Sequence, residues 1–210
     1  TVLDTARLKY MLGEHLSVDP RDVHAYIVGE HGDSEVAAWS SATVAGVPLN
    51  DYCELHGHFD HKAAEARIAD DVKNSAYEII EKKRATYYGI AMSVRRICTA
   101  IMRDEDTVLP VSSLMVGEYG LNDLCISVPT VIGRNGVVTR VPVALSDDEN
   151  AEFQKSAAAL KAIIDDAGSK ALDKGSKALG KQLGKTKGMF GSFMSEYKKA
   201  AGTPPRKQKK

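Results

Sequence analysis

Long apolar runs are missing from this sequence of 210 residues. A membrane-spanning helix needs about 18 or more consecutive apolar residues, and no stretch comes near that length. The first residues, TVLDTARLKY, also lack the basic segment followed by an apolar segment that marks a secretory signal. With 43% hydrophobic and 27% charged residues, the composition is instead typical of a globular domain in water.

Cysteine is scarce as well. The three cysteines, Cys53, Cys98 and Cys125, are odd in number, widely spaced and without a C-x-x-C pair. This pattern argues against a disulfide framework and against a zinc site built from thiolates. We therefore expect the protein to work in a reducing compartment, the cytoplasm.

The formal net charge of zero conceals two oppositely charged segments. Residues 168–210 contain twelve Lys and Arg against two acidic residues, a net charge of +10. Residues 1–167 contain 16 basic and 26 acidic residues, a net charge of −10. A change of this size marks a boundary near Ala167. We expect a folded domain over residues 1–167 and a basic tail over residues 168–210.

The basic tail has the pattern of a cationic amphipathic helix. Its lysines recur at steps of three and four, so they would form one stripe on a helix with apolar side chains opposite. The lysines are Lys170, Lys174, Lys177, Lys181 and Lys185, and the apolar residues are Leu172, Leu179, Leu183, Phe190, Met194 and Tyr197.

Cationic amphipathic helices typically bind an anionic surface, either lipid or an acidic protein face. The alternative is a solvated, disordered extension. Five glycines disfavour a free helix by about 1 kcal/mol each, so we expect residues 168–199 to be helical only when bound. Nothing in the sequence indicates nucleic acid binding.

Up to residue 167, helical and extended patterns alternate in blocks. Helical spacing of apolar residues predicts helices over residues 1–15 and 61–104, the second with a break near Arg84. Strands are predicted over residues 23–28, 35–49, 108–116 and 124–133. Such blocks indicate an α+β fold with a mostly antiparallel sheet and long helices.

Two local signals refine this prediction. Asn135-Gly136 predicts a tight hairpin turn, because both residue types tolerate a positive φ. Ser146, with Glu149 three residues later, forms a capping box that starts a final helix. The residues expected on the buried side of that helix are Phe153, Leu160 and Ile164.

A histidine stands at the end of a predicted buried strand, in HAYIVGEHGDSEV. His31 follows the apolar run that ends at Gly29 and is followed by Gly32. Near the N-terminus, Asp4 and Arg7 are three residues apart and share one helix face. A carboxylate held against an imidazole favours the protonated ring, which can then act as a general acid. A guanidinium nearby binds a substrate carboxylate through two parallel hydrogen bonds. On these residues alone, a structural histidine and a simple surface ion pair are the favoured interpretations.

Three motifs together resemble the substrate-side half of an L-lactate dehydrogenase. They are VLDTAR, then VGEHGDS with its histidine 27 residues after the aspartate, then ATYYGIAMS. The resemblance covers residues 1–167 and implies the fold of the C-terminal domain of lactate and malate dehydrogenases. It assigns the proton-relay pair to Asp4 and His31, and the substrate-carboxylate arginine to Arg7. The threonine of the substrate pocket is then Thr86, and the apolar residue against the nicotinamide is Ile90.

The resemblance also implies a reaction and its partners. NADH would reduce pyruvate to L-lactate in glycolysis and fermentation, with protonated His31 giving its proton to the carbonyl oxygen. A homotetramer is implied. Glu30 before the histidine, together with Thr86, favours the lactate branch over lactate-like malate dehydrogenases. In bacterial relatives an arginine and a histidine bind a sugar-bisphosphate effector at a subunit interface. These positions fall on Lys9 and His24, and the lysine departs from the pattern.

Half of the active site of that family has no counterpart in the sequence. No G-x-G-x-x-G follows a strand, so the phosphate-binding turn of a Rossmann domain is absent from these 210 residues. The closing loop that polarises the carbonyl and selects the substrate in the family is absent as well. We therefore expect this chain to bind NADH and to be active only with the nucleotide-binding half. A binding module that acts through its basic tail is the alternative from another functional class.

A second group of histidines is only weak evidence for a metal site. His56, His58 and His61 lie close to Asp60 in the sequence HGHFDHK. Loop histidines before a helix are common, and the spacing matches no zinc pattern. We expect no metal site.

Overall fold

The computed structural model describes the backbone of residues 1–182 and the side chains of residues 1–167. The chain divides into two compact units, residues 1–161 and 162–210. The first unit contains four helices and three small antiparallel sheets before the start of the last helix. This arrangement confirms the α+β fold. No helix among the described residues is both long and apolar enough to cross a membrane.

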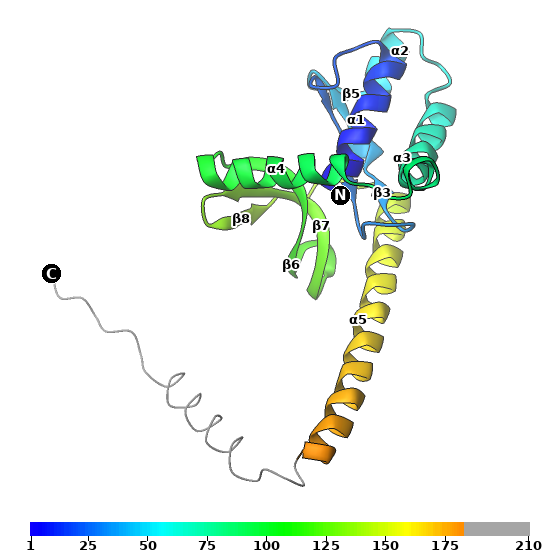
Figure 1. Cartoon of the computed structure of the whole chain (residues 1–210). Coiled ribbons are helices and arrows are strands. Elements are labelled where there is room, and N and C mark those ends of the chain that lie inside the picture. Colours follow the sequence, from blue (N-terminus) through cyan, green and yellow to red (C-terminus); the bar gives the residue numbers. More distant parts are fainter. Residues whose placement is uncertain (183–210) are drawn as a thin grey trace, which may run out of the picture. The chain divides into compact units, whose positions relative to one another are not determined.

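The helices agree with the sequence pattern, with one addition (Figure 1). The α-helices are α1 (Val2–Leu16), α2 (Leu49–Leu55), α3 (His61–Lys83), α4 (Tyr88–Arg103) and α5 (Asp147–Gln182), and short 3-10 helices span Trp39–Ser41 and Glu118–Gly120. The expected break near Arg84 is confirmed, because Arg84 adopts a left-handed conformation with φ 65° and ends α3. The sequence analysis missed α2, which follows Pro48 directly and buries Leu49 and Cys53.

The largest sheet contains β6 (Thr107–Val116), β7 (Asn122–Gly133) and β8 (Gly136–Arg140). All pairs are antiparallel, and α4 lies across one face of the sheet (Figure 1). The predicted hairpin turn is displaced by one residue. Gly133 pairs with Gly136, so the turn residues are Arg134 and Asn135, and only Gly136 takes a positive φ. A bulge interrupts the pairing of β7 with β8 just before this turn, between Val131 and Ile132.

Five two-residue strands surround the histidine loop. They are β1 (Val23–His24), β2 (Ile27–Val28), β3 (Val36–Ala37), β4 (Thr43–Val44) and β5 (Val47–Pro48). The predicted strand over residues 23–28 is in fact two strands in different sheets, since β1 pairs with β4 and β2 pairs with β3. The chain changes sheets at Ala25 and Tyr26, and this turn brings the end of β2 beside β7.

Two main clusters of apolar side chains hold the first unit together. One lies between α1, α2, α3 and β1, with Leu8, Leu12, Val23 and Ile68 among its buried members. The other joins β2, β3, β6 and β7 to the first turns of α5 around Phe153. The histidine loop lies where the two clusters meet, because β1 belongs to the first and β2 contributes Val28 to the second.

The capping box that starts α5 is confirmed. The Ser146 backbone N–H donates to Glu149 Oε2 at 2.8 Å, and the Glu149 N–H donates to Ser146 Oγ at 3.3 Å. Of the three expected core residues, Phe153 is fully buried and Leu160 packs at the edge of its cluster. The third prediction is wrong, since Ile164 is 47% exposed. It belongs to the second unit, which begins at Ala162.

The helical backbone of α5 continues through the predicted boundary near Ala167. The first part of the basic tail is thus helical in the free chain, where we expected helix only on binding. The remaining part of that prediction, from residue 183 onward, lies outside the described residues.

Candidate active site

His31 lies on a loop that is fixed from two sides. Just before it, Gly29 exchanges two backbone hydrogen bonds with Ser127 of β7, at 2.9 and 3.1 Å. The Glu30 N–H donates to Ser156 Oγ of α5 at 2.8 Å. Gly29 has a φ of 95°, and a Cβ at this position would lie 2.8 Å from Ser156 Oγ. The glycine therefore meets two needs at once: a left-handed backbone and a close approach to α5.

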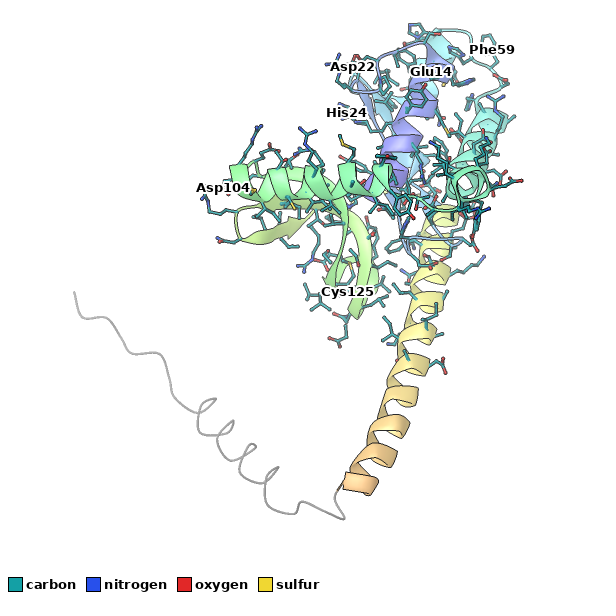
Figure 2. All side chains as sticks on the ribbon, in the orientation of Figure 1. Glu14, Asp22, His24, Phe59, Asp104 and Cys125 are labelled. Carbon is teal, nitrogen blue, oxygen red and sulfur yellow. The ribbon has the colours of Figure 1, made fainter. Side chains whose placement is uncertain are left out.

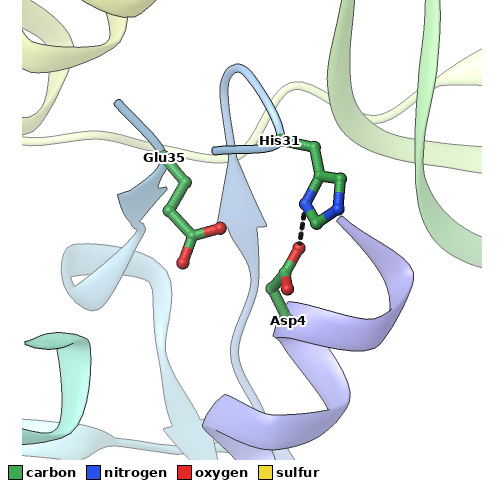
Figure 3. Close-up of side chains that lie close together, drawn as sticks. All are labelled: Asp4, His31 and Glu35. Atoms are coloured by element: carbon green, nitrogen blue, oxygen red, sulfur yellow. Dashed lines mark ion pairs between the residues drawn. The ribbon is translucent and has the colours of Figure 1, made fainter. Parts of the chain in front are cut away.

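Asp4 meets this loop from the first turn of α1 (Figure 3). The residue is only 2% exposed, and its Oδ2 lies 2.7 Å from His31 Nδ1. Its other oxygen, Oδ1, accepts a hydrogen bond from Arg7 Nη1 at 3.3 Å. The spacing of three residues on α1 thus brings Asp4 and Arg7 together as the sequence predicted, and Asp4 stands between the arginine and the histidine.

The contact between Asp4 and His31 changes the acidity of both groups. Asp4 raises the pKa of His31, and this effect outweighs the burial of the ring, which lowers it. Burial alone would raise the pKa of Asp4, but the His31 contact and charge, together with the charges of the N-terminus and Arg7, bring it below its ordinary value. The side chain of His31 remains 67% exposed, so the ring has a nitrogen toward Asp4 and an open side. An imidazole held by a carboxylate on one nitrogen and open on the other side can act as a general acid.

Sequence reasoning missed Glu35, which lies just before β3. Its side chain points toward the Asp4–His31 pair (Figure 3), and the residue is only 5% exposed. Burial, followed by the negative charge of Asp4, raises the pKa of Glu35 to about 7. Donor atoms of all three residues lie within 4.8 Å of one another. The available signal was a glutamate next to a buried strand, four residues after the candidate histidine.

Arg7 and Thr86 line a common cavity of about 240 Å³ between α1 and the turn from α3 to α4. A neighbouring cavity of about 230 Å³ contains Arg7 with Asp4 and His31. Thr86 does not line this second cavity. Arg7 is therefore the residue that connects the Thr86 pocket to the Asp4–His31 pair.

A larger cavity of about 410 Å³ places Ile90 with Asp4 and His31. Its other lining residues are mostly apolar and come from α4 and β6, among them Val94, Ile97 and Val111. Ile90 itself is 49% exposed. A flat apolar ring with a polar edge fits such a cavity, because its lining combines apolar side chains with the His31 imidazole.

Lys9 and His24 also share a cavity, of about 350 Å³, away from His31. Lys9 lies on α1 and His24, labelled in Figure 2, on β1. Arg96 of α4 lines the same cavity and was not predicted. Its guanidinium pairs with Glu105 at 2.5 Å. The cavity is thus lined by three basic side chains. Arg96 supplies an arginine to this cavity, although Lys9 occupies the position where the resemblance implies one.

The first unit matches proteins of known activity. Residues 1–171 match the model of the lactate/malate dehydrogenase alpha/beta C-terminal domain. The L-lactate dehydrogenase of Acetivibrio thermocellus is 52% identical over 164 residues, which is 78% of this chain and 52% of that protein. The ligand-bound crystal structure of the minor L-lactate dehydrogenase of Enterococcus mundtii is similar with a TM-score of 0.74 and 48% identity, over 79% of this chain and 52% of that one.

Malate dehydrogenase is among the similar structures as well. The enzyme of Cryptosporidium parvum has a TM-score of 0.74 at 36% identity, covering 80% of this chain and 54% of that one. The chain spans about half the length of the curated relatives that it matches. On the match over residues 1–171 and these identities, the chain belongs to the lactate/malate dehydrogenase family, and its first unit has the fold of that family's C-terminal domain.

Proposed function

We propose that this chain supplies the substrate-side half of an NAD-dependent L-lactate dehydrogenase, which interconverts pyruvate and L-lactate. The observation that carries the proposal is the buried Asp4 carboxylate, which contacts His31 on one oxygen and Arg7 on the other. The relatives named L-lactate dehydrogenase, at about 50% identity, support the choice of reaction.

In this proposal His31 is the general acid. Protonated His31 donates the proton of its exposed nitrogen to the keto oxygen of pyruvate as negative charge develops there. Asp4 stabilises the imidazolium through the contact at Nδ1, which also fixes the orientation of the ring. In the reverse direction the neutral ring accepts the hydroxyl proton of lactate. The raised pKa of His31 favours the form needed for pyruvate reduction.

Arg7 binds the carboxylate of the substrate, with Thr86 lining the same pocket. Its guanidinium offers a planar pair of donors that matches a carboxylate. In the structure one of these donors is used by Asp4 at 3.3 Å, a long hydrogen bond that leaves the rest of the guanidinium available. Positioning of this kind accounts for about 7–11 kcal/mol of the barrier in well-oriented model reactions.

The apolar cavity beside His31 fits the nicotinamide ring of the cofactor. Ile90, Val94 and Ile97 would contact the ring face, and Asp4 and His31 line the same cavity. NADH, when bound, supplies the hydride that reduces the keto carbon. The residues of this chain exclude water from that side of the cavity and hold the proton donor. The nucleotide-binding half must provide the contacts to the phosphates and adenosine.

Several properties of the whole enzyme belong to the same proposal. We expect a homotetramer in the cytoplasm, in which the chain acts with its nucleotide-binding half and is inactive without it. The cavity with Lys9, His24 and Arg96 is the expected site of a sugar-bisphosphate effector. Three basic side chains around one cavity suit a phosphate group.

The test is to join this chain to the nucleotide-binding half of the Acetivibrio thermocellus enzyme and to measure pyruvate-dependent NADH oxidation. The joined protein is expected to be active, whereas the 210-residue chain alone is not expected to bind NADH in calorimetry. His31→Asn should abolish most turnover and leave NADH binding intact. Arg7→Lys should raise KM for pyruvate, and His56→Asn, at an exposed position, is the matched control. An active joined protein that tolerates His31→Asn would refute the assignment.

Malate dehydrogenase is the second candidate, favoured by the similarity to the Cryptosporidium parvum enzyme. The two reactions share the Asp4–His31 pair and Arg7, so the site described above does not separate them. The joined protein separates them directly, by its kcat/KM for pyruvate against that for oxaloacetate. We expect pyruvate to be preferred.

A further inference from the structure

We propose that Asp4, His31 and Glu35 form an inhibitory binding site for a divalent transition metal ion, with Zn²⁺ as the expected metal. The three side chains come from α1, the histidine loop and the residue before β3, and they point toward one another (Figure 3). Among the described residues they are the group of His, Cys, Asp and Glu with donor atoms close enough to share an ion.

The first observation is a pair of buried carboxylate oxygens without hydrogen bonds. Asp4 Oδ2 and Glu35 Oε1 are both inaccessible to solvent, and neither has a hydrogen-bond partner among the described residues. The one close contact of Oδ2 is with His31 Nδ1, at 2.7 Å, whereas Glu35 Oε1 has none. Buried polar atoms nearly always have partners, because an unpaired one loses its hydration without replacement. Two such oxygens beside one imidazole are a set of donors that a cation would satisfy.

The second observation is the match between these donors and zinc chemistry. Zn²⁺ takes imidazole nitrogen at about 2.0–2.1 Å and carboxylate oxygen at about 2.0–2.2 Å, often with three protein ligands and one water. Tetrahedral ligands at these lengths lie roughly 3.4 Å apart. The three donors, which lie within 4.8 Å of one another, would have to approach more closely to reach that spacing. Asp4 and His31, now 2.7 Å apart, would separate slightly.

Space and access are also present. The three residues line one cavity of about 230 Å³, which has room for an ion and its water. His31 is exposed on the outer side, so an ion can enter from solvent. Two positive groups line the same cavity: Arg7, which is bound to Asp4 Oδ1, and Lys73. Since Arg7 binds Oδ1, the other oxygen, Oδ2, contacts only His31 and can bind the ion that replaces the ring proton.

The metal would inhibit the proposed reaction because it binds the Nδ1 atom of His31. This consequence rests on the proposed function. An ion on His31 Nδ1 takes the place of the proton that Asp4 stabilises. The ring is then a metal-bound imidazole whose remaining N–H is a far weaker acid than an imidazolium, so the proton donor of the reaction is lost. Metal binding itself does not depend on the reaction and can be tested on this chain alone.

The test is calorimetric titration of the 210-residue chain with ZnCl₂ in a buffer that does not bind metal. We expect one site, and Glu35→Gln should weaken zinc binding at least about 100-fold, since loss of a supporting group alone typically weakens a site 10–100-fold. The control removes the competing histidines, as His56→Gln with His58→Gln, and should leave the affinity unchanged. Titration with CoCl₂ then identifies the ligand type, because the exposed Cys98 and Cys125 would add a thiolate charge-transfer band.

The outcomes separate the proposals. Unchanged zinc affinity in Glu35→Gln, loss of binding in the histidine control, or a thiolate band would each overturn the metal site. Circular dichroism verifies that Glu35→Gln is folded. NMR spectra of the unmodified chain test the site without any variant at Glu35, because the His31 ring signals should shift when zinc is added. In the joined enzyme, zinc should inhibit pyruvate reduction less in Glu35→Gln than in the parent. A joined enzyme without activity would contradict the proposed function and leave the zinc titration intact.

Discussion

Glu35 should make the stability of the fold fall as pH rises toward neutrality, and Glu35→Gln should remove that fall. In the folded chain the burial of Glu35 and the charge of Asp4 raise its pKa from 4.5 to about 7. The opposite charges of His31 and Lys73 only partly offset these effects. A carboxyl group whose pKa is raised by folding is held more tightly as the neutral acid in the folded state than in the unfolded chain.

The sign and size follow from this shift. The stabilisation is fully present below pH 4.5, where Glu35 is protonated in both states, and is lost as pH rises through about 7. One pKa unit corresponds to about 1.4 kcal/mol, so the whole change is at most about 3 kcal/mol. Glutamine has the shape of the neutral acid and does not ionise. Glu35→Gln should therefore have a free energy of unfolding close to that of the parent below pH 4.5, and exceed it by up to about 3 kcal/mol at pH 8.

Urea denaturation followed by circular dichroism at several pH values between 5 and 8, with EDTA present, measures this difference. Glu65→Gln is the matched control, because Glu65 is equally buried at 7% exposure but has the Lys62 ammonium 3.2 Å away. This control measures the effect of replacing a buried glutamate that does not contact Asp4. If the difference between Glu35→Gln and the parent stays constant from pH 5 to pH 8, Glu35 does not bind a proton in the way that its surroundings indicate.

Three further predictions concern the site and the tail. Asp4→Asn should lower the pKa of His31 toward its ordinary value of 6.5, which a titration of the ring signals in NMR spectra would show; an unchanged pKa would mean that the contact has no electrostatic effect. Ser156→Ala should reduce the free energy of unfolding by about 1–3 kcal/mol, because the Glu30 N–H loses its buried acceptor, and the exchange rate of that amide should rise. A peptide of residues 168–210 should gain helix, by circular dichroism, on anionic vesicles and not on neutral ones; no gain on either would leave the tail without a membrane-binding role.

Local sequence signals predicted the elements that are governed by local interactions. The capping box at Ser146 and the break at Arg84 depend on residues within one or two turns of helix, and both were correct. The helix predicted over residues 1–15 was also correct, and the spacing of Asp4 and Arg7 correctly predicted that the two side chains lie together on it. Such features depend on backbone geometry and nearby hydrogen bonds, which a short stretch of sequence specifies.

Features that depend on distant packing were missed. The apolar run over residues 23–28 gives no sign that it divides between two sheets, because that division depends on β3 and β4 as partners. Glu35 looked like an ordinary residue of a β-rich stretch, and only the fold places it against Asp4. Arg96 is separated from Lys9 and His24 by more than 70 residues of sequence. Its place in their cavity follows from the packing of α4.

The two anchors of the histidine loop have a consequence for the order of folding. Gly29 is held by Ser127, and Glu30 by Ser156, which is 126 residues away along the chain. Closing loops of this length carries a large entropic penalty that local contacts do not offset, and contacts of high sequence separation form late in most small domains. During synthesis, Asp4 and His31 emerge long before the residues that fix the loop. We therefore expect His31 to reach its position beside Asp4 only after the start of α5 has packed against β7, so the candidate site is completed among the last parts of this unit.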